Sequence, residues 1–276
     1  MADSPAAPFA DWPDSTFNSL DGWTWVGCYG GYMLQCDALQ DFAHGFFTRH
    51  WEGRGPAELA GYLSPGLTVH RLRQVHGGVV MTAHDAVAPP WPAADGLIST
   101  AGGQSLWVCG ADCTPVLMAD PGTGHVAACH GGWRSLAAGV LSAAVERLGA
   151  QGVEPARLQV ALGPAVSGPC YQVERSVVSN RVAASLHGDG LQRLLAAGDL
   201  KPDPQPGGQP LRDHLDIRGA AALQLQDAGV PATALHTCPY CTFTEERLFH
   251  SWRRDQRKAV QWSGIAGQAM AGRGDG

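Results

Sequence analysis

The sequence has no long apolar run, no dense basic stretch and no export signal. No uninterrupted apolar segment approaches the length of a membrane span, so we expect no membrane partner. A formal net charge of −6 and the lack of a Lys/Arg cluster argue against nucleic-acid binding. The first residues contain prolines and acidic side chains, where a signal peptide needs a basic start and an apolar core. We therefore expect a cytoplasmic protein.

The eight cysteines give no reason to expect disulfides, since the chain is large and shows no export signal. Cys238 and Cys241 form a CxxC, which alone suggests a redox pair or half of a zinc site. No second CxxC and no thioredoxin-like context accompany it. Structural, reduced thiols are the favoured interpretation.

The middle of the chain has the pattern of short strands joined by tight turns. Apolar runs punctuated by Gly, Asp and Pro predict strands at 105–109, 114–119, 125–129 and 158–162. Apolar residues at helical spacing predict one helix of about three or four turns over 133–152. Other segments are expected to form helices at 174–186 and 216–229, a strand at 232–237, an exposed loop at 201–210, and irregular structure or short strands within 1–40.

Three polar groups lie where the pattern predicts the ends of extended segments. His76 follows a short extended run, Asp112 and Cys113 occupy a turn between two apolar strands, and His130 ends a strand. Imidazole and thiolate are good zinc ligands, and three of them leave a fourth position open, as in catalytic zinc sites. The gaps between them are far longer than zinc-finger spacings, so spacing alone leaves ordinary packing as an alternative.

A second candidate site follows His130. Gly131 and Gly132 precede a predicted helix, whose N-terminus together with Arg134 can hold a phosphate or a carboxylate. The alternative is a glycine turn packed closely against a strand, with Arg134 in a surface ion pair. For Arg253 and Arg254 a solvated basic face is expected.

Several segments, taken together and in order, resemble the laccase-domain family. Members of this family have been called polyphenol oxidases, peptidoglycan editing factors and purine nucleoside phosphorylases. The resemblance covers roughly residues 40–265, and its most specific blocks are those around Cys113 and His130. The segments that carry it are "HGFFTR", "RQVHGGVV", "ADGLIST", "ADCTPVLMAD", "HVAACHGGWRSLAAGV", "LGPAVSGPCYQV" and "CTFTEERLFHSWRRD".

The resemblance implies an α+β fold, a single domain of mixed β-sheets packed with helices around a metal-containing pocket. We expect an irregular N-terminal extension over 1–40, the laccase-family domain over 41–265 and a flexible tail over 266–276. The resemblance also implies a metal, usually zinc, with copper as the alternative. Its ligands come from the QVHG, ADC and HxGWR motifs, and here these residues are His76, Cys113 and His130.

The implied activity is purine nucleoside chemistry: phosphorolysis of adenosine, inosine and methylthioadenosine, and deamination of adenosine. The expected partners are a purine nucleoside and phosphate, with the protein a monomer or homodimer. The expected catalytic residues are Cys113, Asp112 and Arg49, with Asp112 orienting a ligand or acting as acid/base. The expected substrate or phosphate contacts are Arg49, Gln74, Asp95, Gly131, Gly132 and Arg134.

The sequence departs from the family pattern in ways that leave the substrate preference open, while the ligand set is intact, so metal binding and some catalysis are expected. The segment after Arg49 is shortened, and the usual Thr-Gly-Arg after "RRD" is contracted to "QRKAV". One alternative is a polyphenol oxidoreductase with copper in the same site, although the His-x-His pairs of conventional multicopper laccases are absent. Another is a peptidoglycan-precursor editing hydrolase with Cys113 as nucleophile and His130 or His76 as base. A non-catalytic binding protein is the last.

Overall fold

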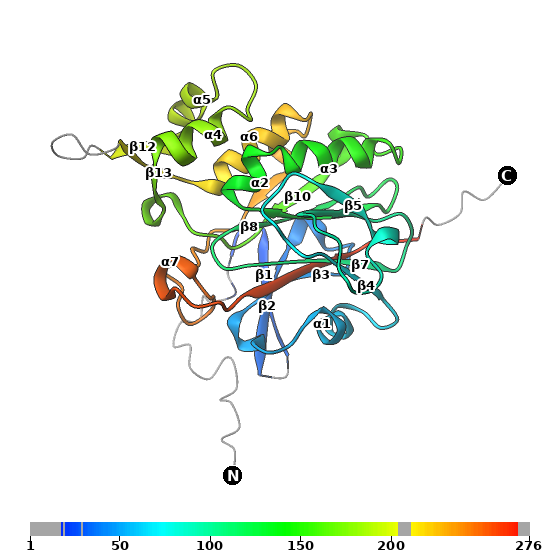
Figure 1. The fold of residues 1–276 in the computed structure, drawn as a ribbon. Helices are drawn as coiled ribbons and strands as arrows, with labels where there is room; N and C mark the ends of the chain where they lie inside the picture. Colours follow the sequence, from blue (N-terminus) through cyan, green and yellow to red (C-terminus); the bar gives the residue numbers. More distant parts are fainter. Residues whose placement is uncertain (1–17, 19, 29, 204–210, 270–276) are drawn as a thin grey trace, which may run out of the picture.

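The computed structural model describes residues 18, 20–28, 30–203 and 211–269. Its architecture is a single α+β domain in which two six-stranded mixed sheets lie face to face, as the sequence predicts (Figure 1). The first sheet has the order β1-β2-β3-β15-β7-β4. Its strands are β1 (Trp23–Cys28), β2 (Gly31–Cys36), β3 (His44–Phe47), β15 (Gln261–Ala266), β7 (Gln104–Gly110) and β4 (Thr68–Arg71).

The second sheet has the order β14-β10-β8-β9-β6-β5 and contains most of the strands predicted from apolar runs. Its central strands β8 and β9 are buried along their whole length, so both faces of this sheet are covered. Its strands are β14 (Leu235–Thr237), β10 (Gln159–Leu162), β8 (Thr114–Ala119), β9 (Val126–Gly131), β6 (Gly96–Ile98) and β5 (Val80–Thr82).

Alternating side chains along β8 show how the layers pack. Leu117 faces the first sheet and joins Phe46 and Val108 in the apolar core between the sheets. Val116 and Met118 point the other way, into a core shared with the helices. On the outer face of the first sheet, a third cluster packs against α1 (Pro56–Leu63). Figure 1 shows α1 below the sheets and the remaining larger helices above them.

The helix predicted over 133–152 is two helices, α2 (Trp133–Ala137) and α3 (Val140–Gly149). Gly139 separates them with a φ of +75°, a left-handed conformation that glycine adopts without steric cost and that a continuous helix cannot contain. The other helices are α4 (Asn180–Ala183), which a π-helical turn precedes, α5 (Gly190–Ala197), α6 (Ile217–Asp227) and α7 (Trp252–Asp255). Helices are therefore confirmed where the sequence predicts them at 174–186 and 216–229.

Other expectations need adjustment. The N-terminal region contains short strands, because β1 and β2 form an antiparallel hairpin that extends the first sheet. Part of the loop expected at 201–210 is a strand: β12 (Leu200–Asp203) pairs with β13 (Arg212–Leu215), and β11 (Gln172–Glu174) completes this third sheet. Residues 204–210, and 270–276 of the expected tail, lie outside the described residues. Within the described ranges no helix is long and apolar enough to span a membrane.

Candidate metal centre

Three separate segments bring His76, Cys113 and His130 together. Cys113 lies in the turn between β7 and β8, His130 in β9 beside that turn, and His76 in the loop after β4. One potential ligand atom from each residue lies within 4.8 Å of the other two. The two imidazole rings are nearly perpendicular, with centroids 4.7 Å apart. The three residues that the sequence proposes as metal ligands therefore form one cluster.

The backbone at this cluster takes unusual conformations. His76 has a φ of +59° and Asp112, next to Cys113, has a φ of +91°. Non-glycine residues rarely adopt this left-handed region, so the surrounding structure has to hold them there. Hydrogen bonds hold both places: the His76 N–H donates to the buried Asp95 carboxylate, and the Asp112 carbonyl accepts from a neighbouring N–H. This N–H is that of Val166, at 3.0 Å.

Asp95 organises two of the three potential ligands. The backbone N–H groups of Val75, His76 and Gly77 donate to its carboxylate at 3.1, 2.9 and 2.7 Å. Its Oδ1 also lies 2.9 Å from Nδ1 of His130. The side chain is fully buried. Asp95, expected to contact substrate, thus spends its hydrogen-bonding capacity on the protein, and this arrangement fixes the ring of His130 with Nε2 left for a ligand.

The electrostatics of the cluster favour an ionised thiol. Burial raises the pKa of Cys113, but the charge and hydrogen bonds of His130 and His76 outweigh burial and lower the pKa to about 6. Burial lowers the pKa of His130, whereas Cys113 and Asp95 together raise it to about 9. Thiolate and imidazole are the side-chain groups that ligate zinc or copper in proteins.

The position of Gly132, directly after the strand that contains His130, leaves little room for a side chain. A Cβ at this position would lie 3.0 Å from Cys113 Sγ, 3.2 Å from His76 Cδ2 and 3.3 Å from His130 Cε1. A Cβ on Gly131 would lie 2.9 Å from the carbonyl oxygen of Thr114. Both glycines therefore allow close approach of the chain to the cluster and to β8. The helix they precede, α2, has only five residues, so close packing accounts for the glycines.

A cavity of about 300 Å³ opens over the cluster. The triad contributes to its lining, together with residues of the β7–β8 turn and of the segment after α7. This shape suits a small organic substrate. The other lining residues are Gln74, Cys109, Gly110, Ala111, Trp252, Arg257, Lys258, Ala259 and Val260.

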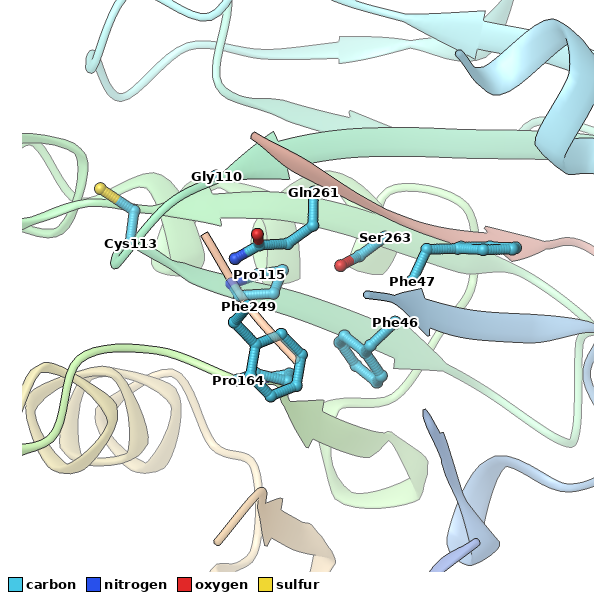
Figure 2. A pocket seen from close by; sticks show the side chains of 9 residues that line it. All are labelled: Phe46, Phe47, Gly110, Cys113, Pro115, Pro164, Phe249, Gln261 and Ser263. Carbon is cyan, nitrogen blue, oxygen red and sulfur yellow. The ribbon is translucent and has the colours of Figure 1, made fainter. Parts of the chain in front are cut away.

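A second, much smaller cavity lies on the interior side of Cys113 and is shown in Figure 2. Aromatic side chains including Phe46 and Phe249 line it, with Gln261 and Ser263 of β15. In Figure 2 the sulfur of Cys113 points away from these side chains. Cys113 therefore closes the apolar interior on one side and presents its sulfur to the two histidines on the other.

Two further residues of the expected site are used to hold the chain. Gln74 forms two hydrogen bonds with the backbone of Cys109, at 2.7 and 2.8 Å, although it lines the cavity. Asp112 accepts from Thr242 Oγ1 at 2.7 Å and from the Arg253 N–H at 2.6 Å. These contacts make Asp112 the residue that ties the C-terminal motif segment to the β7–β8 turn.

The two arginines expected at the site do not line this cavity. Arg49 Nη1 donates to the Glu246 carbonyl at 2.7 Å. Arg134 packs over the ring of Trp133 and lines a different surface cavity with Arg181. Spacing in the motif places Arg134 two residues beyond Gly132, but the first turn of α2 directs it away from the cavity that contains the triad.

The "SWRRD" segment is not the solvated basic face that its sequence suggests. Arg254 is largely buried and donates to the carbonyls of Thr242, Phe243 and Phe249 at 2.8–2.9 Å. Arg253 is exposed but stacks over the ring of Tyr171, 5.0 Å from its centroid. Arg253 and Arg254 point in different directions because they are neighbours on the short helix α7. Ser251 caps the first turn of this helix.

The CxxC cysteines serve packing. Cys238 is fully buried, and burial raises the pKa of its thiol to about 12. The sulfur of Cys241 accepts a hydrogen bond from Ser167 N–H at 3.2 Å. Both are free thiols. The interpretation as structural, reduced thiols agrees with this geometry.

Residues that sequence reasoning missed lie at the start of α7 and in the contracted segment after "RRD". Trp252, Arg257 and Lys258 line the triad's cavity, and nearly half of the Trp252 side chain is exposed. The exposed tryptophan is a signal for ligand contact, but only the fold shows that Trp252, Arg257 and Lys258 line the same cavity as His76 and Cys113.

The donor set fits a metal. Two imidazoles and a thiolate of lowered pKa suit zinc or copper, and three protein ligands leave one tetrahedral position open to the cavity. A carboxylate behind one histidine is the usual support of such a ligand, and Asp95 provides it. Among the described residues this is the one group of three potential ligands within such a short distance.

Comparison with known proteins agrees with the motifs. A family model described as multi-copper polyphenol oxidoreductase laccase matches residues 58–268. The chain belongs to this family. The membership predicted from the sequence motifs is therefore confirmed.

Individual relatives cover between 67% and 89% of the chain. A purine nucleoside phosphorylase of Synechocystis sp. is 38% identical over 256 residues, which are 89% of this chain and 97% of that protein. A purine nucleoside phosphorylase of Streptomyces griseus is 37% identical over 67% of this chain and 68% of its own length. The crystal structure of YlmD from Geobacillus stearothermophilus has a TM-score of 0.73 at 26% identity, covering 89% of this chain and 98% of YlmD.

Proposed function

We propose that the protein is a zinc-dependent purine nucleoside enzyme. Its reactions are phosphorolysis of adenosine, inosine and methylthioadenosine, and deamination of adenosine. The observation that carries the proposal is the cluster of His76, Cys113 and His130 lining a cavity of about 300 Å³. Relatives named purine nucleoside phosphorylase that match most of the chain support the substrate class. A cytoplasmic location, and a monomer or homodimer, are part of this proposal.

The residues around the cavity have different roles in this proposal. His76, Cys113 and His130 would hold the ion, with Asp95 fixing His130 and the loop of His76. A bound zinc ion supplies Lewis acidity, which makes water a better nucleophile near neutral pH. Trp252 offers an exposed ring at the cavity on which a purine can stack. Asp112 acts indirectly, by positioning the segment that carries Trp252.

In phosphorolysis, a phosphate oxygen forms a bond to ribose C1′ while the C1′–N9 bond breaks. The purine leaves with the bonding electron pair and takes up a proton, giving the free base and ribose 1-phosphate. In deamination, water adds at purine C6 and ammonia leaves. Both reactions need polar groups beside the bound nucleoside, and the triad supplies them in the lining of its cavity.

The test is chromatographic product analysis of zinc-loaded protein incubated with adenosine, with and without phosphate. We expect phosphate-dependent adenine, or inosine, and loss of both products in the Cys113→Ala variant and in a chelated sample. Arg147→Gln, at an exposed position of α3 that does not line the cavity, serves as the matched control. Absence of any purine product from the zinc-loaded parent would overturn the proposal.

A second candidate is a polyphenol oxidoreductase with copper in the same site, which the description of the family favours. The donor set accepts copper, but within the described ranges the triad is the one ligand cluster of this kind, and one copper ion supplies only one electron at a time. Oxygen uptake by copper-loaded protein with a phenol tests this candidate. The editing-hydrolase alternative needs Cys113 as a free nucleophile, so it requires full activity after chelation.

A further inference from the structure

The cavity over the triad has a basic wall. Arg257 and Lys258 line it together with Trp252, and both basic residues are exposed. Apart from the two histidines of the triad, these two are the basic residues among those that line this cavity. An anion that enters the cavity therefore meets them beside the triad.

The wall is anchored at both of its ends to the segment just before Cys113. At its start, the Arg253 N–H donates to Asp112 Oδ2 at 2.6 Å. At its end, Gln261 of β15 pairs with Gly110 of β7. Gly110 ends β7 and Asp112 directly precedes Cys113 in the β7–β8 turn, so residues 257–260 are held at a defined place relative to the sulfur.

The turn that starts this wall is specified by the backbone. Gln256 ends α7 with a φ of +52°, a left-handed conformation that reverses the chain after one short helix. Arg254 clamps the preceding segment through three backbone carbonyls. The basic pair follows directly after this turn.

Arg134, another candidate for binding an anion, does not line the triad's cavity. Arg134 lines a different cavity, with Trp133 and Arg181. Glu52 Oε1 lies 3.9 Å from Arg257 Nη2, but this pair is exposed on both sides and such pairs contribute little. Positive charge remains available for a ligand.

We propose that Arg257 and Lys258 bind the phosphate co-substrate at the mouth of the triad's cavity. The inference rests on the proposed function for the identity of the anion. Phosphate carries charge and acceptor oxygens that guanidinium and ammonium groups bind through charge-assisted hydrogen bonds. Their placement on the wall that also carries Trp252 sets the phosphate next to the nucleoside.

The experiment compares the parent with the double variant Arg257→Gln/Lys258→Gln, both single variants, and Arg147→Gln on α3 as control. The wall residues and Arg147 are all exposed, so the fold is expected to survive, and circular dichroism checks it. Initial rates of phosphorolysis give KM for phosphate and for nucleoside separately. Calorimetric titration with inorganic phosphate measures binding without any turnover.

In the double variant we expect KM for phosphate to rise at least about tenfold, since two charged hydrogen-bond donors are lost. We expect KM for nucleoside to stay within about twofold, intermediate values for the single variants, and no change in Arg147→Gln. A phosphate KM within about twofold of the parent would overturn this inference and leave the proposed function intact.

The calorimetric arm separates the two possible failures. If the parent forms no phosphate-dependent product, the proposed function fails, yet the titration still decides the phosphate site. Phosphate binding by the parent that is lost in the double variant supports the site. Binding that is equal in both proteins, or absent from the parent, overturns it.

Discussion

Replacing Gly132 with alanine tests whether the triad is a metal site held at ligand distances. The backbone here has φ −74° and ψ 158°, which alanine adopts freely. The added methyl group would lie 3.0 Å from Cys113 Sγ and 3.2–3.3 Å from the rings of His76 and His130. The strain therefore falls on the three potential ligands and not on the chain.

The size of the effect follows from these distances. Contacts this short require the neighbours to move by a few tenths of an ångström, whereas metal–ligand distances tolerate only about 0.2 Å. We expect zinc affinity to fall about 10–100-fold, the range seen when the support of a ligand is lost. Competition with a chromophoric chelator measures this affinity, and urea unfolding of metal-free protein measures stability.

The matched control is Gly61→Ala in α1. No atom lies within 4 Å of the added methyl group there, and the site is exposed. Alanine in a helix interior stabilises by about 0.5–1 kcal/mol relative to glycine, with zinc affinity unchanged. Zinc affinity of Gly132→Ala within twofold of the parent would refute the reasoning that this glycine is required by the triad.

Two other changes test the supports of the fold and site. Asp95→Asn replaces one carboxylate oxygen with an NH2 group, so the part-buried N–H groups of Val75 and Gly77 lose their acceptor. We expect the free energy of unfolding in urea to fall by about 1–3 kcal/mol and zinc binding to weaken; wild-type values of both would contradict this. Burial and Asp216 raise the pKa of Asp199 from 3.8 to about 6. The folded protein therefore binds this proton more tightly than the unfolded chain. The free energy of unfolding falls as the pH rises from 3.8 to about 6. Asp199→Asn should remove that fall; an unchanged slope counts against it.

The strands could be predicted because they are buried on both faces. Each of the runs at 105–109, 114–119 and 125–129 is a short apolar segment between turn residues, and each is a strand. The helix break at Gly139 was not predictable from apolar spacing, because spacing stays helical across one left-handed residue. Pairing between β15 and β7 joins segments about 150 residues apart, which no local pattern specifies.

In the candidate site too, some residues could be predicted from the sequence and the roles of others could not. Residue types at strand ends marked His76, Cys113 and His130, and the resemblance to the family joined them into one ligand set. The roles of their neighbours depend on hydrogen bonds across the chain. Asp95 and Asp112, expected at the substrate, direct their carboxylates to backbone and side-chain donors of other segments.

The sequence by itself determined which chemistry is available: thiol and imidazole side chains at the ends of apolar strands, next to glycines that permit close approach. Only the tertiary structure decided what faces the cavity. It turned Arg134 away, brought Arg257 and Lys258 beside the triad, and made Arg254 a structural clamp. The physical reason is that local pattern fixes the strand or helix, while the direction of a charged side chain follows from long-range strand pairing and from the buried donors that must be satisfied.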